Sequence, residues 1–143
     1  MTAIGALLLL LGLVALTAAT GVVLRATAGR VRRARRAERL APSEVGASAF
    51  GDRATFLQFS TAYCAQCPGT ARVLSGIAAE HPGVEHLDVD LAARPELATR
   101  FGVLQTPTTL LLDAHGTVRG RIGGPARPAD VRGAIDRILT ETP

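Results

Sequence analysis

The sequence is poor in the residues that build metal centres. Its 143 residues include two cysteines, three histidines, no tryptophan and no lysine. A structural zinc site needs about four Cys or His ligands, usually supplied as two spaced pairs. The chain has no second cysteine pair, and its histidines do not stand at ligand spacing, so we expect no metal. All sixteen basic residues are arginine, which we interpret as coding bias without chemical meaning.

The net charge of +4 is concentrated in one short segment. Residues 1–40 contain seven arginines and one glutamate, whereas residues 41–143 contain nine arginines and eleven acidic residues. A nucleic-acid-binding domain needs a basic face or a basic surface interleaved with aromatic side chains. Neither pattern is present in the second segment, and we expect no nucleic-acid partner.

An uncharged run opens the chain. Ala3 to Leu24 spans 22 residues, which as a helix would reach about 33 Å and cross a bilayer. We predict a transmembrane helix over residues 1–24, with the lipid bilayer contacting residues 3–24. A cleaved signal peptide would need a basic start and a shorter apolar stretch, and Met1-Thr2 carries no side-chain charge. A buried core helix is disfavoured because the run is long and apolar on all sides.

An arginine-rich segment follows the apolar run. It contains Arg25, Arg30, Arg32, Arg33, Arg35, Arg36 and Arg39. Positive charge close to a membrane helix marks the cytoplasmic side, so we predict a single-pass protein whose C-terminal part is cytoplasmic. If the segment were helical, it would place several arginines on one face, where they could bind anionic lipids. We favour the simpler interpretation that these arginines only set the orientation in the membrane and otherwise form a solvated linker. Ala41-Pro42-Ser43 ends this segment, which we interpret as a juxtamembrane linker over residues 25–42.

Residues 43–143 have the patterning of one α/β domain without repeats. Short apolar runs predict strands and three- to four-residue periodicity predicts helices. In chain order we predict a strand over 54–60, a helix over 65–80, a strand over 84–90, a helix over 92–101, strands over 108–112 and 118–122, and a helix from Pro128 onwards. A parallel unit followed by a hairpin and a covering helix implies a mixed sheet with helices on both faces.

The two cysteines lie where the first predicted strand of this domain gives way to a helix. Cys64 and Cys67 are separated by Ala65-Gln66. Such a pair can open and close a disulfide, which favours redox chemistry. A static disulfide is disfavoured because so short a loop restricts the unfolded chain little, although an inactive structural remnant remains an alternative.

This arrangement resembles the thioredoxin family over about residues 43–140. The similarity consists of the strand-Cys64-Ala65-Gln66-Cys67-helix order, Gln105-Thr106-Pro107-Thr108 entering a strand about forty residues later, and Gly123-Gly124 after the hairpin. The resemblance implies a thioredoxin-like fold and a cis peptide between Thr106 and Pro107, placing that loop against the cysteines. It also implies substrate contacts at Tyr63, Thr106, Pro107 and Gly123.

The chemistry of the pair requires a thiolate. A helix N-terminus stabilises that negative charge, so Cys64 at the helix entrance is the predicted nucleophile. Cys67, one turn further on, is the predicted resolving thiol, which attacks the mixed disulfide formed at Cys64. No cofactor is implied beyond the redox-active disulfide.

Two positions depart from the family pattern. Gln58 stands where many members carry a buried Asp that assists proton transfer, and His86 stands where many have a Lys. A glutamine side chain cannot act as a base. A water molecule or His86 is left as the proton acceptor, and a purely structural role for His86 is the simpler alternative.

These observations favour a membrane-anchored thiol-disulfide oxidoreductase acting on protein thiols and disulfides, with an unidentified electron donor or acceptor. One alternative is the same enzyme on the extracytoplasmic side. Another is a membrane-tethered binding module that holds partners beside Thr106 and Pro107 with little or no turnover.

Overall fold

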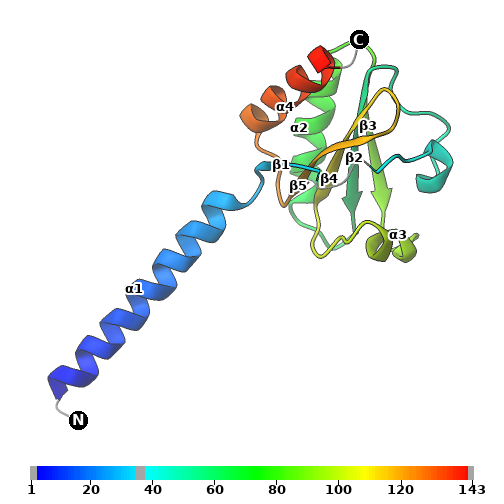
Figure 1. Ribbon diagram of the computed structural model, residues 1–143. Helices are drawn as coiled ribbons and strands as arrows, with labels where there is room; N and C mark the ends of the chain where they lie inside the picture. The colour runs from blue at the N-terminus through cyan, green and yellow to red at the C-terminus, as the bar shows by residue number, and fades with distance from the viewer. Residues whose placement is uncertain (1–2, 35–37, 142–143) are drawn as a thin grey trace.

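A five-stranded mixed sheet forms the centre of the domain in a computed structural model that describes residues 3–34 and 38–141 (Figure 1). The strand order is β1-β5-β4-β2-β3. Strands β2 and β3 run parallel, and the other neighbours are antiparallel, so the predicted mixed sheet is confirmed. The strands are β1 (Val31–Arg33), β2 (Ala54–Ser60), β3 (Val84–Asp90), β4 (Thr108–Asp113) and β5 (Val118–Gly123).

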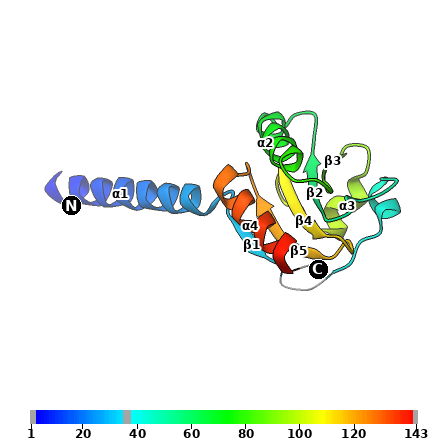
Figure 2. The same ribbon diagram turned by 90° about the horizontal axis from the view of Figure 1, so that it is seen from above.

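Helices cover both faces of this sheet, as the pattern predicted. On one face α2 packs beside α4, while α3 and a short 3-10 helix lie towards the other face (Figures 1 and 2). The long helix α1 extends away from the sheet. The helical segments are α1 (Ala3–Thr27), the 3-10 helix (Pro42–Val45), α2 (Cys67–Ala79), α3 (Pro95–Arg100) and α4 (Pro128–Glu141).

Strand β2 is buried on both faces, which is why its sequence is almost continuously apolar. Phe56 points into a core cluster with residues of α2 and α4, such as Leu74 and Ile135. Leu57 and Phe59 belong to a second cluster on the α3 side of the sheet. The ring of Phe59 stacks on Phe101 with centroids 5.4 Å apart. Two cores therefore fix the strand that leads into the cysteine loop.

Two helices begin later than predicted, each next to a proline. Helix α2 starts at Cys67 instead of residue 65, with Pro68 in its first turn. Helix α3 starts at Pro95 instead of residue 92, because a turn held by the Ala92 N–H donating to Asp90 Oδ1 precedes it. Proline favours the first helical position, where its fixed φ fits and its missing N–H has no partner to lose.

The arginine-rich segment differs from the predicted linker over residues 25–42, because part of it joins the sheet. Val31 pairs with Ile122 of β5, and its side chain packs against the core. The alternative of a helical arginine face, which was not favoured, does not hold at Arg32, because Arg32 and Arg33 lie in strand β1. The physical reason is the open edge of β5, which β1 satisfies with backbone hydrogen bonds. Arg35 and Arg36 lie outside the described residues.

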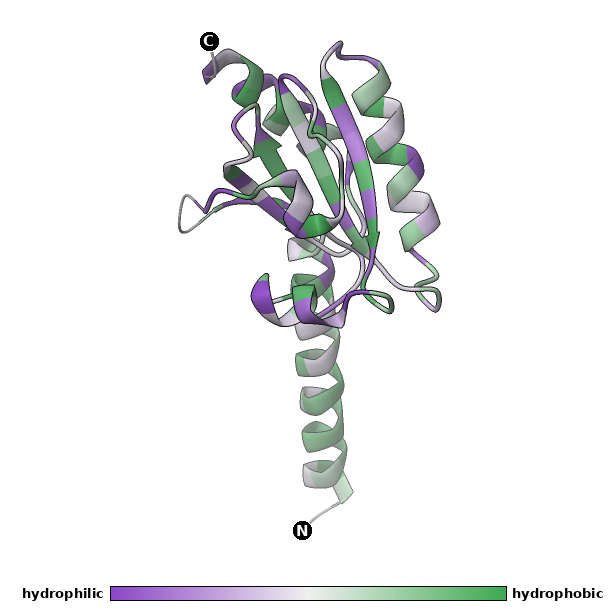
Figure 3. Cartoon of the chain, turned by 90° about the vertical axis from the view of Figure 1, so that its right-hand side faces the viewer, coloured by the Kyte–Doolittle hydropathy of each residue, from purple (hydrophilic) through white to green (hydrophobic). Residues whose placement is uncertain are grey.

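Helix α1 buries none of its residues against the domain. It is long and apolar enough to cross a membrane, and it extends well clear of the sheet (Figure 3). Its C-terminal end is nevertheless fastened to the domain. The Gly29 N–H donates to the Gly123 carbonyl at 2.9 Å, and Arg127 Nη2 donates to the Arg25 carbonyl at 2.7 Å.

Candidate active site

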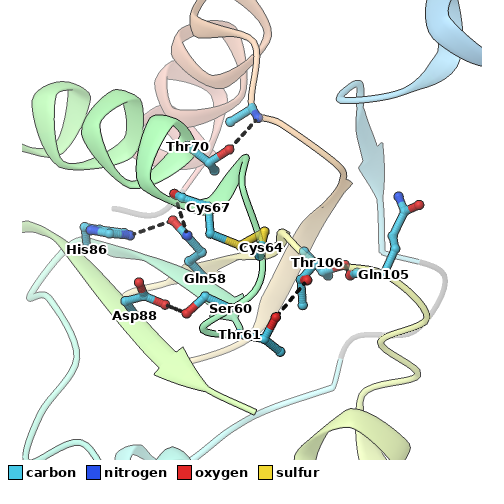
Figure 4. Close-up of a disulfide and its surroundings, with 12 residues drawn as sticks. Gln58, Ser60, Thr61, Cys64, Cys67, Thr70, His86, Asp88, Gln105 and Thr106 are labelled. Carbon is cyan, nitrogen blue, oxygen red and sulfur yellow. Dashed lines mark hydrogen bonds between the residues drawn. A yellow bond between two sulfur atoms is a disulfide. The ribbon is translucent and has the colours of Figure 1, made fainter. Parts of the chain in front are cut away.

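The cysteine pair forms a disulfide at the junction of β2 and α2 (Figure 4). The sulfur atoms are 2.13 Å apart and the Cα atoms 5.4 Å apart. Two backbone bonds shape the loop: the Cys64 N–H donates to the Thr61 carbonyl at 3.1 Å, and the Cys67 N–H donates to the Cys64 carbonyl at 3.2 Å. The loop therefore holds both sulfurs at the N-terminus of α2.

The two cysteines differ in exposure. Cys67 is the first residue of α2 and is 5% exposed, whereas Cys64 lies in the preceding loop and is partly exposed. The neighbouring Tyr63 is 98% exposed. A bulky partner such as a protein disulfide can approach Cys64 far more readily than Cys67.

Gln58 lies directly beneath the disulfide and is fully buried. Its Nε2 donates to the Cys67 carbonyl at 3.2 Å, and its Oε1 lies 3.2 Å from His86 Nε2. A carbonyl oxygen only accepts hydrogen bonds, so the amide NH₂ must face Cys67 and Oε1 must face His86. The hydrogen of the neutral His86 ring is therefore on Nε2, where it satisfies Gln58.

The side chain of His86 is partly buried on β3 beside this network. Burial lowers the pKa of the His86 imidazole, because the charged form loses solvation, and the nearby Asp88 carboxylate opposes this to a smaller extent. Asp88 in turn accepts a hydrogen bond from Ser60 Oγ. In this arrangement the His86 Nε2–H is a donor to Gln58, and it does not face the sulfur atoms as a base.

The loop before β4 lies on the opposite side of the disulfide from His86 (Figure 4). The peptide between Thr106 and Pro107 is cis, which confirms the expectation from the family resemblance. Thr106 Oγ1 lies 3.5 Å from Thr61 Oγ1, so this loop contacts the segment that leads to Cys64. No backbone hydrogen bond within residues 3–34 and 38–141 uses Thr106, although the Pro107 carbonyl accepts from the Gly124 N–H.

Gly123, the last residue of β5, contacts the segment after α1. Its carbonyl already accepts the Gly29 N–H, and the space beside its Cα is filled by Gln105 Nε2, which would be 3.0 Å from an added Cβ. Gly123 thus joins the sheet to the end of α1.

Sequence reasoning gave no role to two exposed residues of the loop before β4, although Gln105 belongs to the Gln105-Thr106-Pro107-Thr108 motif. Leu104 is 97% exposed and Gln105 is also exposed. With Tyr63, Leu104 is one of two large hydrophobic side chains outside α1 that the described part of the chain exposes. The only sequence signal was an apolar residue between predicted elements, which does not reveal exposure. Thr70 was also missed; its Oγ1 accepts the Ala126 N–H and links α2 to the segment before α4.

No group of three or more Cys, His, Asp or Glu side chains within the described residues could hold a metal ion.

The pKa of His86 is predicted to lie below 6.5, the ordinary value for histidine. The imidazole of His86 therefore binds a proton more tightly in the unfolded chain than in the folded chain. Its contribution to folding stability is complete above pH 6.5 and is lost as the pH falls from there through the lowered pKa of the folded state. An NMR titration of the ring in the full chain measures the pKa directly. The His86→Asn variant should lose less stability on acidification than the wild type, and a ring pKa at or above the ordinary value would contradict this prediction.

Comparisons with known proteins agree with this geometry. The chain is 28% identical over 68 residues to thioredoxin H5 from Oryza sativa subsp. japonica, covering 48% of this chain and 50% of that protein. It is 34% identical over 67 residues to a thioredoxin from Chlamydia muridarum, covering 47% of this chain and 66% of that protein. The chain therefore spans half to about two thirds of the length of these curated relatives. No family model matches it.

Solved structures share the fold. A mutant thioredoxin from Halobacterium salinarum superposes with a TM-score of 0.54 at 19% identity, covering 62% of this chain and 76% of that one. Thioredoxin F from spinach chloroplast superposes with a TM-score of 0.53 at 26% identity, covering 62% of this chain and 78% of that one. With its sheet order, its paired cysteines at the start of α2 and the cis proline before β4, the chain belongs to the thioredoxin family.

Proposed function

We propose that the protein is a membrane-anchored thiol-disulfide oxidoreductase that exchanges disulfides with other proteins through Cys64 and Cys67. The main support for this proposal is that the two cysteines of one disulfide differ in exposure. Cys64 is open to a partner, while Cys67 is buried behind it and bonded to it. An accessible attacking thiol and a shielded resolving thiol are what two-step exchange requires.

In the reducing direction, the Cys64 thiolate attacks one sulfur of the partner disulfide. A mixed disulfide forms at Cys64, and the partner's second sulfur leaves as a thiolate. The Cys67 thiolate then attacks Cys64 Sγ, which closes the Cys64–Cys67 disulfide and releases the partner's first sulfur. Two electrons pass from the chain to the partner, and a second dithiol must supply two electrons to restore the chain. The same steps in reverse oxidise a partner dithiol.

The N-terminus of α2 favours the thiolate form of the attacking sulfur. The unpaired N–H groups and the helix dipole place partial positive charge at that end of the helix. Because Cys64 lies in the loop immediately before α2, its sulfur benefits from this charge while staying accessible. An ordinary thiol is mostly protonated at neutral pH, so this stabilisation raises the concentration of the reactive form.

Gln58 acts in this proposal as a positioning residue. It holds the Cys67 carbonyl through its amide and is itself held by His86. Because neither group presents a base to the sulfurs, a water molecule is the proton acceptor left for Cys67 in this proposal. Because Gln58 is uncharged, it also places no negative charge beneath Cys67 that would oppose formation of the Cys67 thiolate.

Thr106 and Tyr63 provide the partner contacts in this proposal. The backbone of Thr106 is not used by the sheet and can pair with an extended partner segment, since extended chains bind to free strand edges in this way. Tyr63 offers an exposed aromatic surface beside Cys64. Pro107 and Gly123 then serve to shape and support the loop.

Helix α1 is the proposed membrane anchor. The thioredoxin-like domain, predicted over residues 43–143 and extended by β1 to Val31, is proposed to lie on the cytoplasmic side. The length and composition of α1 support a single span, and the arginines that follow support the orientation. Lipid contacts would then fall on the exposed apolar side chains of α1.

A binding module with little turnover is the second candidate function. Gln58 is the observation that favours it, because a site without a buried base resolves mixed disulfides more slowly than one with such a base. Covalent trapping distinguishes the two functions.

The Cys67→Ser variant should accumulate mixed disulfides with protein partners, because the resolving sulfur is gone. Non-reducing gels of cells that express the variant would show adducts that thiol reductants remove. The Cys64→Ser variant is the matched control and should form far fewer adducts, since Cys67 is buried. Absence of thiol-dependent adducts with Cys67→Ser would favour the binding module and contradict oxidoreductase activity.

Cys64 in the Cys67→Ser variant should resist a membrane-impermeant maleimide in intact cells and react once the membrane is permeabilised, because the domain is proposed to be cytoplasmic. A Thr2→Cys reporter, which precedes the residues proposed to contact lipid, should show the opposite pattern in a Cys64→Ser, Cys67→Ser background. Ready labelling of Cys64 in intact cells would place the enzyme on the extracytoplasmic side.

A further inference from the structure

A groove opens between the end of α1 and the loop that joins α3 to β4. Its cavity volume is about 730 Å³, and its walls include Leu24 and Ala28 on one side and Leu104 and Gln105 on the other. Gln105 directly precedes Thr106, and it also lines a second pocket that includes Thr106 and Gln66. The groove therefore continues from the disulfide site towards the end of α1.

The groove is strongly basic. Among the described residues that line it there is no Asp or Glu, but there are four arginines: Arg25, Arg30, Arg32 and Arg121. Within the described ranges, none of these arginines forms a salt bridge. Several like charges in a concave site produce a positive potential that attracts anionic groups.

Two of these arginines are placed directly opposite each other. Arg32 of β1 and Arg121 of β5 are partners in the antiparallel register, and both line the groove. Arg121 donates to the carbonyls of Phe101 and Gly102 after α3. Burial lowers its pKa, yet an arginine stays charged in proteins. Like charges opposite each other across two strands are destabilising, and an anion between them would relieve this.

The other side of the same strand shows a different pattern. Arg33, the next residue along β1, lines a pocket that also contains Glu141. Glu141 there forms a salt bridge with Arg119 at 3.0 Å. On the Arg33 side, Glu141 therefore provides a carboxylate next to the arginines. On the groove side, no carboxylate of the described residues does so.

We propose that this groove binds an acidic, extended segment of the protein whose disulfide reacts at Cys64. The inference rests on the proposed function and adds the class of partner. A polypeptide is favoured over lipid headgroups because the groove adjoins Thr106, whose free backbone can pair with the same segment. The 97% exposed Leu104 offers an apolar contact that a peptide side chain can cover.

The test uses the reduced full chain in uncharged detergent micelles and two disulfide peptides. The peptides share one sequence, except that the acidic residues beside the cysteine in one are replaced by their amides in the other. At low salt the acidic peptide should react about tenfold faster. Arg32→Gln should slow the acidic peptide by about threefold and leave the neutral one unchanged. Arg33→Gln is the matched control and should change neither rate, and added salt should reduce the preference.

Equal rates for the two peptides would overturn the inference, as would equal effects of Arg32→Gln and Arg33→Gln. Loss of the acidic preference in nanodiscs containing phosphatidylglycerol would show that lipid headgroups occupy the groove instead. If neither peptide reacts, the proposed function fails. Fluorescence anisotropy then still tests whether the groove binds the acidic peptide, in a version whose cysteines are replaced by serine. Its affinity should be weaker for Arg32→Gln than for the wild type and unchanged for Arg33→Gln, and equal affinities for all three would overturn the inference.

Discussion

The site depends on the burial of β2 between two hydrogen-bonded neighbours and two hydrophobic cores. Strand β3 pairs with it on one edge and β4 on the other, along nearly its whole length. Phe56 is anchored on the α2 side, and Leu57 and Phe59 on the α3 side. A strand held in this way has one register, since a slip by one residue would turn every side chain to the wrong core. Gln58 is thereby fixed beneath the disulfide.

The fixed position of Gln58 determines the hydrogen bonds beneath the disulfide. The amide of Gln58 joins His86 to the Cys67 carbonyl in a neutral, fully hydrogen-bonded arrangement. Buried polar groups are costly unless paired, and here each partner satisfies the other. In the proposed mechanism the result is a resolving thiol without a neighbouring negative charge and without a buried base. The exchange chemistry then relies on the N-terminus of α2 and on water at the open face.

Much of the fold was predictable from sequence because its signals are local. The apolar run over 54–60 and the periodicity of α4 have the spacing that each element requires, and the structure agrees with them. Strand β1 was not predictable, because three residues rich in arginine carry no strand signal and are recruited by the edge of β5. The cysteines and the Thr106–Pro107 loop were found through the family resemblance. The exposure of Leu104 and the pairing of Arg32 with Arg121 depend on tertiary structure alone.

The proposed mechanism depends on the order of attack, in which Cys64 attacks first and Cys67 resolves. Mass spectrometry of the reduced wild-type chain, quenched in acid at successive times after mixing with a peptide disulfide, tests this most directly. The peptide should appear transiently on Cys64 and disappear as the Cys64–Cys67 disulfide forms. A first adduct on Cys67, or a stable adduct on Cys64 that never resolves, would contradict the proposed mechanism.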